Sequence, residues 1–313
     1  MNGSKVESGL GVVPTAAGGV ADVDRVSDRT IPSDRAPGAA DSRRERKIYV
    51  VRPTGFGRLA ELWRFRELAF FLVWREVKIR YKQTILGAAW AVIQPLFAMI
   101  VFTVLFGRLA RLPSEGIPYP VFYYAGLLPW TYFAAVLSGA GNSLIQNSQL
   151  VTKVYFPRVL LPAASAGAAL LDFGIAALFL PLLMLLYGVP LGPGLLLIPV
   201  LTVPLALVAL GVGLLLSALN VNYRDVKYVI PFLTQLWMFL TPVVYPVTLI
   251  PERLRPVAAL NPLTGIVDAF RAAAVGQPIS WQTLGPSLLV IAVVLAVGVT
   301  YFNRTERYFA DVI

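Results

Sequence analysis

Long apolar runs separated by short polar connections occupy most of the chain after residue 84. Each run has about 20 residues or more, which is the length of a helix that crosses ~30 Å of hydrocarbon. Strands of a membrane β-barrel would instead alternate apolar and polar positions over about ten residues. The expected spans are Ala88–Gly107, Val121–Ala140, Ala163–Tyr187, Gly194–Leu219, Tyr228–Val247 and Leu284–Phe302. The pattern therefore predicts an all-α integral membrane protein with six transmembrane helices.

A shorter apolar run precedes the first span and cannot cross by itself. Leu68–Trp74 covers about 10 Å as a helix, and Arg, Lys and Trp residues flank it. A helix lying at the membrane interface has this distribution, and a plain basic flank is the alternative. Residues 48–84 are interpreted as a linker and an amphipathic interface helix, and 85–313 as the six-span domain. Residues 1–47, rich in Gly, Ala, Ser, Asp and Arg, are expected to be a disordered cytoplasmic tail.

Basic residues in the connections predict which ends of the spans face the cytoplasm, because inner loops carry an excess of Lys and Arg. With the N-terminus inside, thirteen Lys and Arg residues beyond the tail lie on the inner side and five on the outer side. Both termini are therefore expected in the cytoplasm. The polar stretch Asn147–Pro162, between spans two and three, is expected on the same side.

The connection between spans five and six contains helix signals of its own. Asn261 is a candidate N-cap, Pro262 suits the first helical position, and Gly276 suits a C-terminal stop. A helix of about fourteen residues is too short to cross comfortably, so a re-entrant or surface element on the outer side is expected. Asp268 and Arg271 lie three residues apart, where they could pair on one face.

Composition excludes several kinds of chemistry. The chain has 313 residues, of which 57% are hydrophobic and 14% charged, and it contains neither Cys nor His. Disulfides, thiolate chemistry, Cys/His zinc sites and imidazole catalysis are thereby excluded. In so apolar a chain, the formal charge of +10 suits membrane orientation and anionic lipid headgroups, so membrane lipids and no nucleic acid are the expected partners.

Signals for an energy source are also missing. None of the six Lys residues follows a Gly, so the Gly-Lys-Ser/Thr of a phosphate-binding loop is absent. ATP-driven work would need a separate subunit. Asp172 is the one acidic residue clearly inside an expected span. It is a functional candidate or a packed hydrogen-bonding residue, and one carboxylate without a charged partner in any span argues against proton or sodium coupling.

The second expected span is unusually aromatic. Tyr119, Tyr123, Trp130 and Phe133 are among its rings, and several recur at helical spacing. Aromatic faces suit the apolar faces of sugar rings, whereas an aromatic belt at the membrane surface is the ordinary alternative. The belt accounts for the tyrosines near the outer surface. Trp130 and Phe133 lie deeper, where a pathway role and ordinary helix packing are the two interpretations.

Four stretches occur in an order that resembles a known family. They are REVKIRYKQTILGAAWAVIQPL (Arg75–Leu96), NSQLVTKVYFPRVLLP (Asn147–Pro162), LNVNYRDVKYVIPFLTQLWMFLTPVVYP (Leu219–Pro246) and NPLTGIVDAFR (Asn261–Arg271). From about Trp74 onward, the chain resembles the membrane subunit of ABC-2-type exporters of polysaccharides and polyol phosphates, such as O-antigen, capsule and teichoic acid. Each stretch alone is a weak signal. Together they are specific for the polysaccharide branch.

The resemblance implies partners and a mechanism. Two copies of the chain would form a homodimer and pair with two cytoplasmic ATPase subunits, which would bind the ATP and Mg that this chain does not. The substrate would be a polysaccharide on a polyprenyl (pyro)phosphate carrier, moved from the cytoplasm across the inner membrane. Asn147–Arg158 would be the coupling helix against the ATPase, and Val257–Gly276 would form outer gate helices.

Candidate site residues follow from these expected roles. Those for ATPase coupling are Gln149, Lys153, Tyr155 and Arg158. Those for the glycan pathway are Tyr119, Tyr123, Trp130 and Phe133. Those for a lipid headgroup are Arg75, Lys78, Arg80 and Lys82, which an ordinary basic flank explains equally well. Those of the outer gate helix are Asn261, Asp268 and Arg271, and the intramembrane polar residue is Asp172.

Two other functions remain open at this point. An ABC-2 exporter of drugs or small lipids would share the fold. A membrane enzyme acting on polyprenyl-linked sugars would generally need clustered carboxylates or His near the membrane surface, whereas this chain has no His and scattered acidic residues. A passive channel is disfavoured further, because no charged or carbonyl-rich filter motif repeats along the chain.

Overall fold

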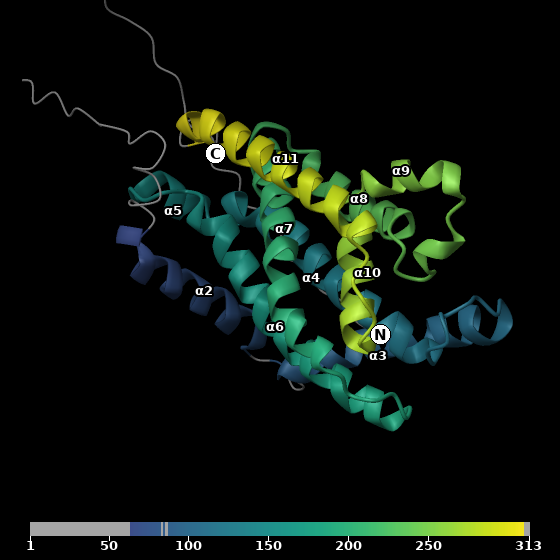
Figure 1. The fold of residues 1–313 in the computed structure, drawn as a ribbon. Helices are drawn as coiled ribbons and strands as arrows, with labels where there is room; N and C mark the ends of the chain where they lie inside the picture. The colour runs from purple at the N-terminus through teal and green to yellow at the C-terminus, as the bar shows by residue number, and fades with distance from the viewer. Residues whose placement is uncertain (1–62, 83, 85–86, 310–313) are drawn as a thin grey trace, which may run out of the picture. The chain divides into compact units, whose positions relative to one another are not determined.

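The computed structural model describes residues 63–82, 84 and 87–309, and every regular element within these ranges is helical (Figure 1). The predicted tail 1–47 and most of the linker lie outside the described residues. The α-helices are α2 (Arg66–Tyr81), α3 (Trp90–Phe102), α4 (Tyr119–Gln146), α5 (Ser148–Lys153), α6 (Leu160–Leu186), α7 (Ile198–Asn222), α8 (Val226–Leu240), α9 (Arg255–Ala259), α10 (Pro262–Val275) and α11 (Trp281–Thr305).

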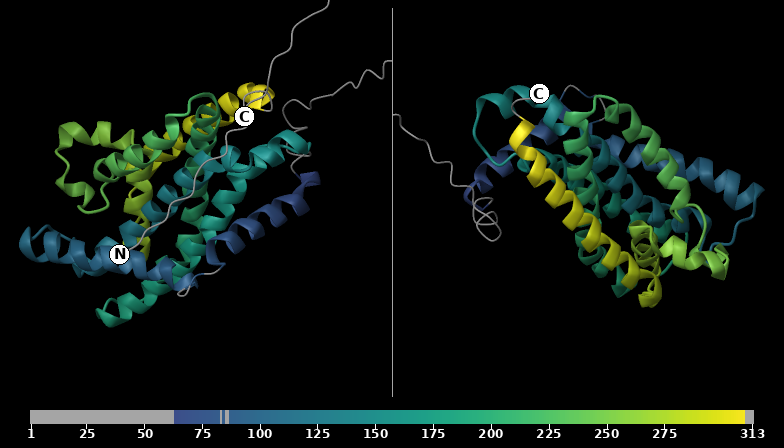
Figure 2. Two further views of the ribbon diagram at one scale, coloured as in Figure 1. Left: turned by 180° about the vertical axis from the view of Figure 1, so that it is seen from behind. Right: turned by 90° about the horizontal axis from the view of Figure 1, so that it is seen from above.

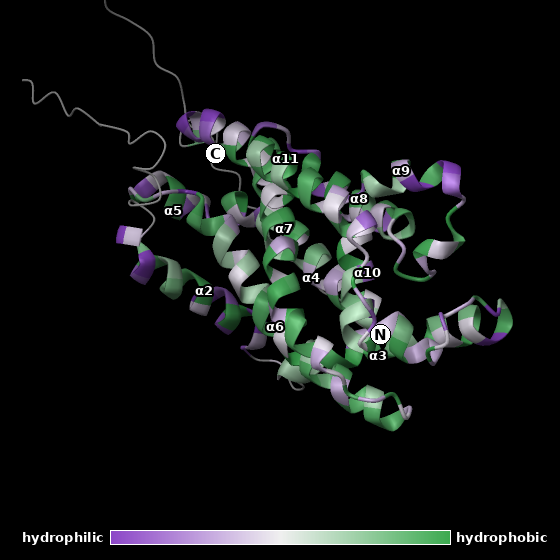
Figure 3. Cartoon of the chain, viewed as in Figure 1, coloured by the Kyte–Doolittle hydropathy of each residue, from purple (hydrophilic) through white to green (hydrophobic). Residues whose placement is uncertain are grey.

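Short tight turns extend several of these helices. The 3-10 turns are η1 (Gly87–Ala89), η3 (Pro193–Leu197), η4 (Val247–Leu249), η5 (Glu252–Leu254) and η6 (Glu306–Tyr308), and η2 (Thr103–Leu109) is a π-helical segment. Five helical stretches are long and apolar enough to cross a membrane: Gly87–Leu109, Tyr119–Gln146, Leu160–Leu186, Pro193–Asn222 and Trp281–Tyr308. They match five of the six expected spans, and apolar residues dominate them (Figure 3).

The fifth expected span, Tyr228–Val247, is wrong as a single helix. α8 has 15 residues, about 22 Å of helix, and it ends where Thr241 adopts an extended conformation with φ −95° and ψ 135°. The physical reason is Pro242, because the residue before a proline is pushed out of the helical region. The chain continues through Thr241–Pro246 as irregular backbone that is largely buried.

α4 is the central helix of the bundle. In its apolar stretch 78% of the residues are buried, against 11% for Gly87–Leu109. α6 and α7 pack along α4, and α11 packs on the far side of α7 (Figure 2). The α7–α11 contact is a backbone contact, since a Cβ added at Gly298 would lie 2.1 Å from the Gly211 carbonyl oxygen. Small residues of this kind let membrane helices approach closely.

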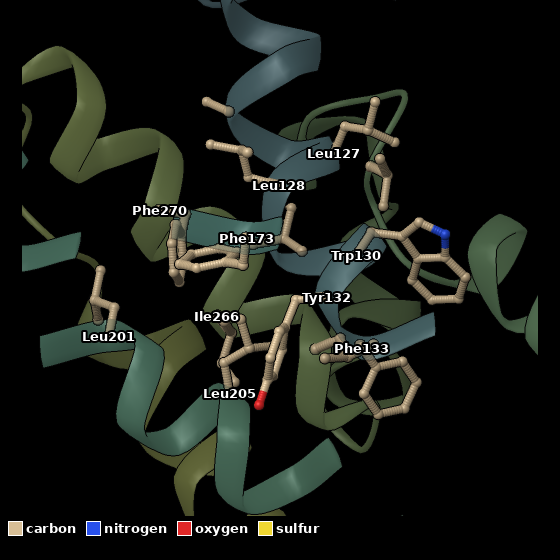
Figure 4. Packing of buried hydrophobic residues seen from close by; sticks show 14 of the residues in the cluster. Leu127, Leu128, Trp130, Tyr132, Phe133, Phe173, Leu201, Leu205, Ile266 and Phe270 are labelled. Carbon is tan, nitrogen blue, oxygen red and sulfur yellow. The ribbon is translucent and has the colours of Figure 1, made fainter. Parts of the chain in front are cut away.

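Two apolar clusters divide the interior. The larger one surrounds α4 and includes side chains from α6, α7 and α10 that meet in Figure 4. The smaller one lies where α4 ends and α5 begins, and we call it the α5-end cluster. Its buried members are Leu72, Leu144, Val151, Phe156, Leu160, Leu161, Ala164, Leu214, Ala218, Val221, Phe302 and Phe309. It therefore joins residues from α2, the segment around α5 and the C-terminal end of the described chain.

α10 has the ends that the sequence predicts. The Asn261 side chain accepts a hydrogen bond from the Leu263 amide at 3.1 Å, Pro262 occupies the first turn, and Gly276 is left-handed with φ 76°. These caps confirm the helix and its bounds. Of the two expected positions, re-entrant or surface, the re-entrant one agrees better with the packing, because α10 contacts α4, α7 and α11 and most of its residues are buried.

Candidate functional site

The segment around α5 is anchored by apolar residues and presents polar ones outward. Val151 and Phe156 are 2% and 5% exposed within the α5-end cluster. Gln149, Lys153 and Tyr155 are exposed, and Tyr155 reaches 72%. Within α5, a short helix packed against one neighbour buries one face and leaves the other exposed. Three of the four predicted coupling residues are thus exposed within one short segment.

Arg158, the fourth, lies differently. Its backbone amide donates to Glu306 Oε1 at 3.1 Å, and its Nη1 donates to the Glu306 carbonyl oxygen. Phe302 and Phe309 stack edge to face beside this contact, with ring centroids 5.3 Å apart. Arg158 therefore ties the segment after α5 to the C-terminal end of α11. The pairing spans 148 positions of sequence, which sequence reasoning had no signal to find.

α2 and its C-cap, Lys82, carry the four predicted headgroup residues, and Arg75, Lys78 and Arg80 have partners within the chain. Arg75 Nη2 donates to Glu76 Oε1 at 2.9 Å and to Asn147 Oδ1 at 2.5 Å, so it reaches the junction of α4 and α5. Lys78 lies over the Trp74 ring at 5.6 Å from its centroid. Lys78 and Lys82 are exposed.

Arg80 and Asp172 form an ion pair between α2 and α6. Arg80 Nη1 donates to one carboxylate oxygen of Asp172, and the Tyr81 hydroxyl donates to the other. Burial, followed by the bond to Asp172, raises the pKa of Tyr81 to about 12, so the hydroxyl stays protonated at neutral pH. The charged partner of Asp172 comes from α2, outside the expected spans, and this arrangement favours a role in holding the two helices together.

The aromatic candidates of α4 are interior side chains within one chain. Tyr119, Tyr123, Trp130 and Phe133 are 7%, 0%, 5% and 0% exposed. The Tyr119 hydroxyl donates to the Val244 carbonyl at 2.9 Å, and the Phe133 ring meets Trp237 edge to face at 5.0 Å. Figure 4 shows Trp130 and Phe133 among the packed residues of this cluster. Their contacts are those of helix packing, and a pathway role stays a prediction.

Arg271 is a buried cation at the opposite end of the bundle. It is 4% exposed, and its Cζ lies 3.8 Å from the centroid of the Phe122 ring. Its guanidinium donates to backbone carbonyls: Nε to Phe122 at 3.3 Å, Nη1 to Tyr245 at 3.3 Å, and Nη2 to Val243. Burial lowers the pKa of Arg271 to about 10, so the group stays charged at neutral pH.

These donors satisfy the irregular backbone after α8. Arg271 and Tyr119 together cap three consecutive carbonyls, at Val243, Val244 and Tyr245. Non-helical backbone inside a membrane protein is tolerated only where its polar groups find such partners. Asn261 extends the same support, because its Nδ2 donates to Thr241 Oγ1 at 2.9 Å.

The predicted pairing of Asp268 with Arg271 is absent from the part of the chain that the structure describes. Asp268 Oδ2 instead accepts from Thr283 Oγ1 at 2.9 Å, which links α10 to α11. Arg271 points toward α4 and the break after α8. Sequence spacing suggested a helix-surface pair, whereas the burial of α10 gives each side chain a separate partner.

The apolar helices define a multi-pass membrane protein, and comparison with known proteins gives its family. The sequence model of the ABC-2 type transporter family matches residues 67–275. The chain belongs to this family.

Several relatives of known name align with most of the chain. The O-antigen export system permease protein RfbA of Myxococcus xanthus is 34% identical over 219 residues, which are 68% of this chain and 82% of the relative. A Klebsiella pneumoniae protein of that name is 26% identical, covering 76% and 92%. The polysialic acid transport protein KpsM of Escherichia coli is 25% identical, covering 76% and 93%. The chain is thus a transport subunit and a multi-pass inner membrane protein.

Proposed function

We propose that the chain is the transmembrane subunit of an ATP-driven exporter that moves lipid-linked polysaccharide from the cytoplasm across the inner membrane. The observation that carries this proposal is the similarity to permeases named for O-antigen and polysialic acid, which extends over 82% to 93% of their lengths. A homodimer of the chain would bind two copies of a cytoplasmic ATPase. ATP and Mg would be held by that ATPase, because this chain has no Gly-Lys-Ser/Thr loop.

The segment around α5 is the proposed coupling element. A coupling element has to meet a soluble partner and to be attached firmly to the spans that it moves. The exposed Gln149, Lys153 and Tyr155 meet the first requirement, and the buried Val151 and Phe156 meet the second. Arg158 would position the element rather than contact the ATPase, since its hydrogen bonds go to Glu306.

The proposed topology has six crossings with both termini in the cytoplasm. Val226–Leu240 is the shorter apolar helix, and the buried segment Thr241–Pro246 would complete its crossing, with carbonyls capped by Arg271 and Tyr119. α9 and α10 would then form the outer gate. The excess of Lys and Arg at the α5 end supports this orientation.

The anionic head of a polyprenyl (pyro)phosphate carrier is proposed to meet α2. Lys78, Arg80 and Lys82 are all exposed, but Arg80 already pairs with Asp172, and the half-buried Arg75 bonds to Asn147. A compact ammonium on a flexible stem suits a phosphate at the membrane surface. Of the four headgroup candidates, the two lysines are therefore the strongest.

Depletion of the protein tests the proposed function directly. Cells that lack it should accumulate one lipid-linked saccharide on the inner side of the membrane, which extraction and mass spectrometry would identify. A drug-sensitive cell with unchanged lipid-linked saccharides would instead support the drug-exporter alternative. The purified chain alone should hydrolyse no ATP, and hydrolysis that persists after removal of every other protein would contradict the scheme.

A further inference from the structure

The C-terminal segment Phe302–Phe309 and the segment around α5 lie side by side, although about 150 residues separate them in sequence. The direct links are the two hydrogen bonds from Arg158 to Glu306. The views agree, because α5 and the C-terminal end of α11 lie close together in Figure 1 and in both orientations of Figure 2.

A shared interior holds the two segments in one position. Val151 and Phe156 from the α5 segment, and Phe302 and Phe309 from the C-terminal segment, are all at most 5% exposed and belong to the α5-end cluster. Packed apolar contacts of this kind do not slide independently. A partner that binds the outer surface of one segment would therefore also move the other segment.

Both segments expose tyrosine and basic side chains. Tyr155 is 72% exposed and Tyr308 is 60% exposed. Lys153, Arg304 and Arg307 in the same two segments are also exposed. The two segments, 148–158 and 302–309, together contain four basic residues and one acidic residue, Glu306, for a net charge of +3. Tyrosine and arginine dominate the energetic centres of protein–protein interfaces, and a basic patch favours an acidic partner.

We propose that the ATPase-docking surface extends from α5 onto the C-terminal segment, with Arg307 and Tyr308 as contact residues. The inference rests on the proposed function and adds a second contact region to it. The occupant is a folded protein with an acidic face and pockets for two tyrosine rings. A partner seated on both segments would move α11 together with the α4–α5 junction, since the α5-end cluster joins them.

Single introduced cysteines test this directly, because the chain has no cysteine of its own. Tyr308→Cys and Tyr155→Cys report on the two halves of the surface, and Leu249→Cys on η4, 46% exposed in the wild type, is the control. The detergent-solubilised complex with its ATPase, and the chain stripped of ATPase, would be labelled with a membrane-impermeant maleimide. Bound ATPase should slow labelling at both tyrosine positions by about tenfold, the effect of burying an interface residue, and leave Leu249→Cys unchanged.

The outcomes separate the inference from the proposed function. Protection of Tyr155→Cys without protection of Tyr308→Cys would overturn the extended surface and leave the coupling role of α5 intact. Protection of neither, with ATPase still bound, would overturn both. If phosphatidylglycerol alone, without ATPase, protects Tyr308→Cys equally, the segment is a lipid-facing flank and the inference fails.

A charge reversal gives a second readout that does not depend on labelling. Arg307→Glu should lower the ATPase retained on the affinity-tagged chain by about tenfold, whereas Arg307→Lys should retain most of it and Arg253→Glu, on exposed η5, all of it. A monodisperse size-exclusion profile would show that each variant is folded. Wild-type retention by a folded Arg307→Glu variant would contradict the contact.

Discussion

Asp172 and Arg271 are charged residues among the apolar helices, and the chain accommodates them in opposite ways. Asp172 on α6 keeps some contact with solvent, at 25% side-chain exposure, and pairs with Arg80 of α2, which is 35% exposed. Arg271 on α10 is 4% exposed and is bound by backbone carbonyls and an aromatic ring instead of a carboxylate. One charge is held at a helix–helix contact, and the other is enclosed.

The two environments differ because Asp172 forms an ion pair between two helices, whereas Arg271 donates to irregular backbone. A partly exposed ion pair contributes little, because water screens it and competes for both partners. A fully buried cation is costly unless it is hydrogen-bonded, and two of the three bonds from this guanidinium go to carbonyls that lie outside any helix. We therefore infer that Asp172 attaches one helix to another, whereas Arg271 makes the break after α8 possible.

Among substitutions that test the contrast between Asp172 and Arg271, Arg271→Met should have the largest effect. Removal of the guanidinium leaves the carbonyls of Val243 and Tyr245, which lie outside any helix, without these donors, at about 1–3 kcal/mol for each unsatisfied group. We expect a loss of stability of about 3 kcal/mol or more, measured as thermal denaturation in detergent followed by size exclusion. Arg271→Lys should recover only part of it, because an ammonium lacks the planar fork. Wild-type stability of Arg271→Met would show that the carbonyls find other donors.

Overpacking of the Arg271 side chain from α4 should have the next largest effect. A Cβ added at Gly126 would lie 2.6 Å from Arg271 Nη2, whereas one added at Gly174, close to Asp172 in sequence, meets nothing within 4 Å. Gly126→Ala should therefore cost about 1–3 kcal/mol by overpacking. Gly174→Ala is the matched control and should be neutral or slightly stabilising in the same assay. Equal effects of the two substitutions would contradict an enclosed Arg271.

Removal of the carboxylate charge by Asp172→Asn should have a smaller effect. Tyr81 keeps a hydrogen-bond acceptor, and Arg80 remains partly in water, so we expect a cost of about 1 kcal/mol or less. A double-mutant cycle with Arg80→Gln measures the pair itself, and its coupling energy should be about 0.5–1 kcal/mol. A coupling energy several times larger would mean that this ion pair is as enclosed as Arg271.

The smallest effect is expected from Lys78→Gln on the exposed face of α2. Its ammonium lies over the Trp74 ring at 5.6 Å, a contact worth about 0.5–1 kcal/mol at exposed sites. Stability should therefore change by about 0.5 kcal/mol, while export should fall if Lys78 meets the carrier headgroup. Unchanged export per molecule of protein would favour the plain basic flank.

Local signals in the sequence anticipated much of the fold. Asn261, Pro262 and Gly276 bound α10 as predicted, because capping is decided within one helical turn. Five spans were predicted because apolar runs of sufficient length are readable without neighbours. The fifth span was misread because average hydrophobicity hides the effect of Pro242 on Thr241, where the helix ends.

Side-chain partnerships, in contrast, were not readable. Spacing within α10 suggested an Asp268–Arg271 pair, but burial of the helix turned each residue toward a different neighbour. Asp172 found its partner 92 positions earlier, on Arg80. The segment around α5 was predicted as an exposed polar element, yet its attachment to Glu306 through Arg158 emerged only from the packed chain.

The sequence by itself determined that the chain is helical, lies in a membrane and lacks a phosphate-binding loop, because these depend on local composition and spacing. The tertiary structure decided which polar groups are paired and which apolar residues are enclosed. Hydrogen bonds and burial depend on contacts between residues far apart in sequence, such as Arg271 with Phe122, whose partners no local pattern specifies. The roles of Asp172 and Arg271 therefore became distinguishable only once α2, α4 and α10 were in place.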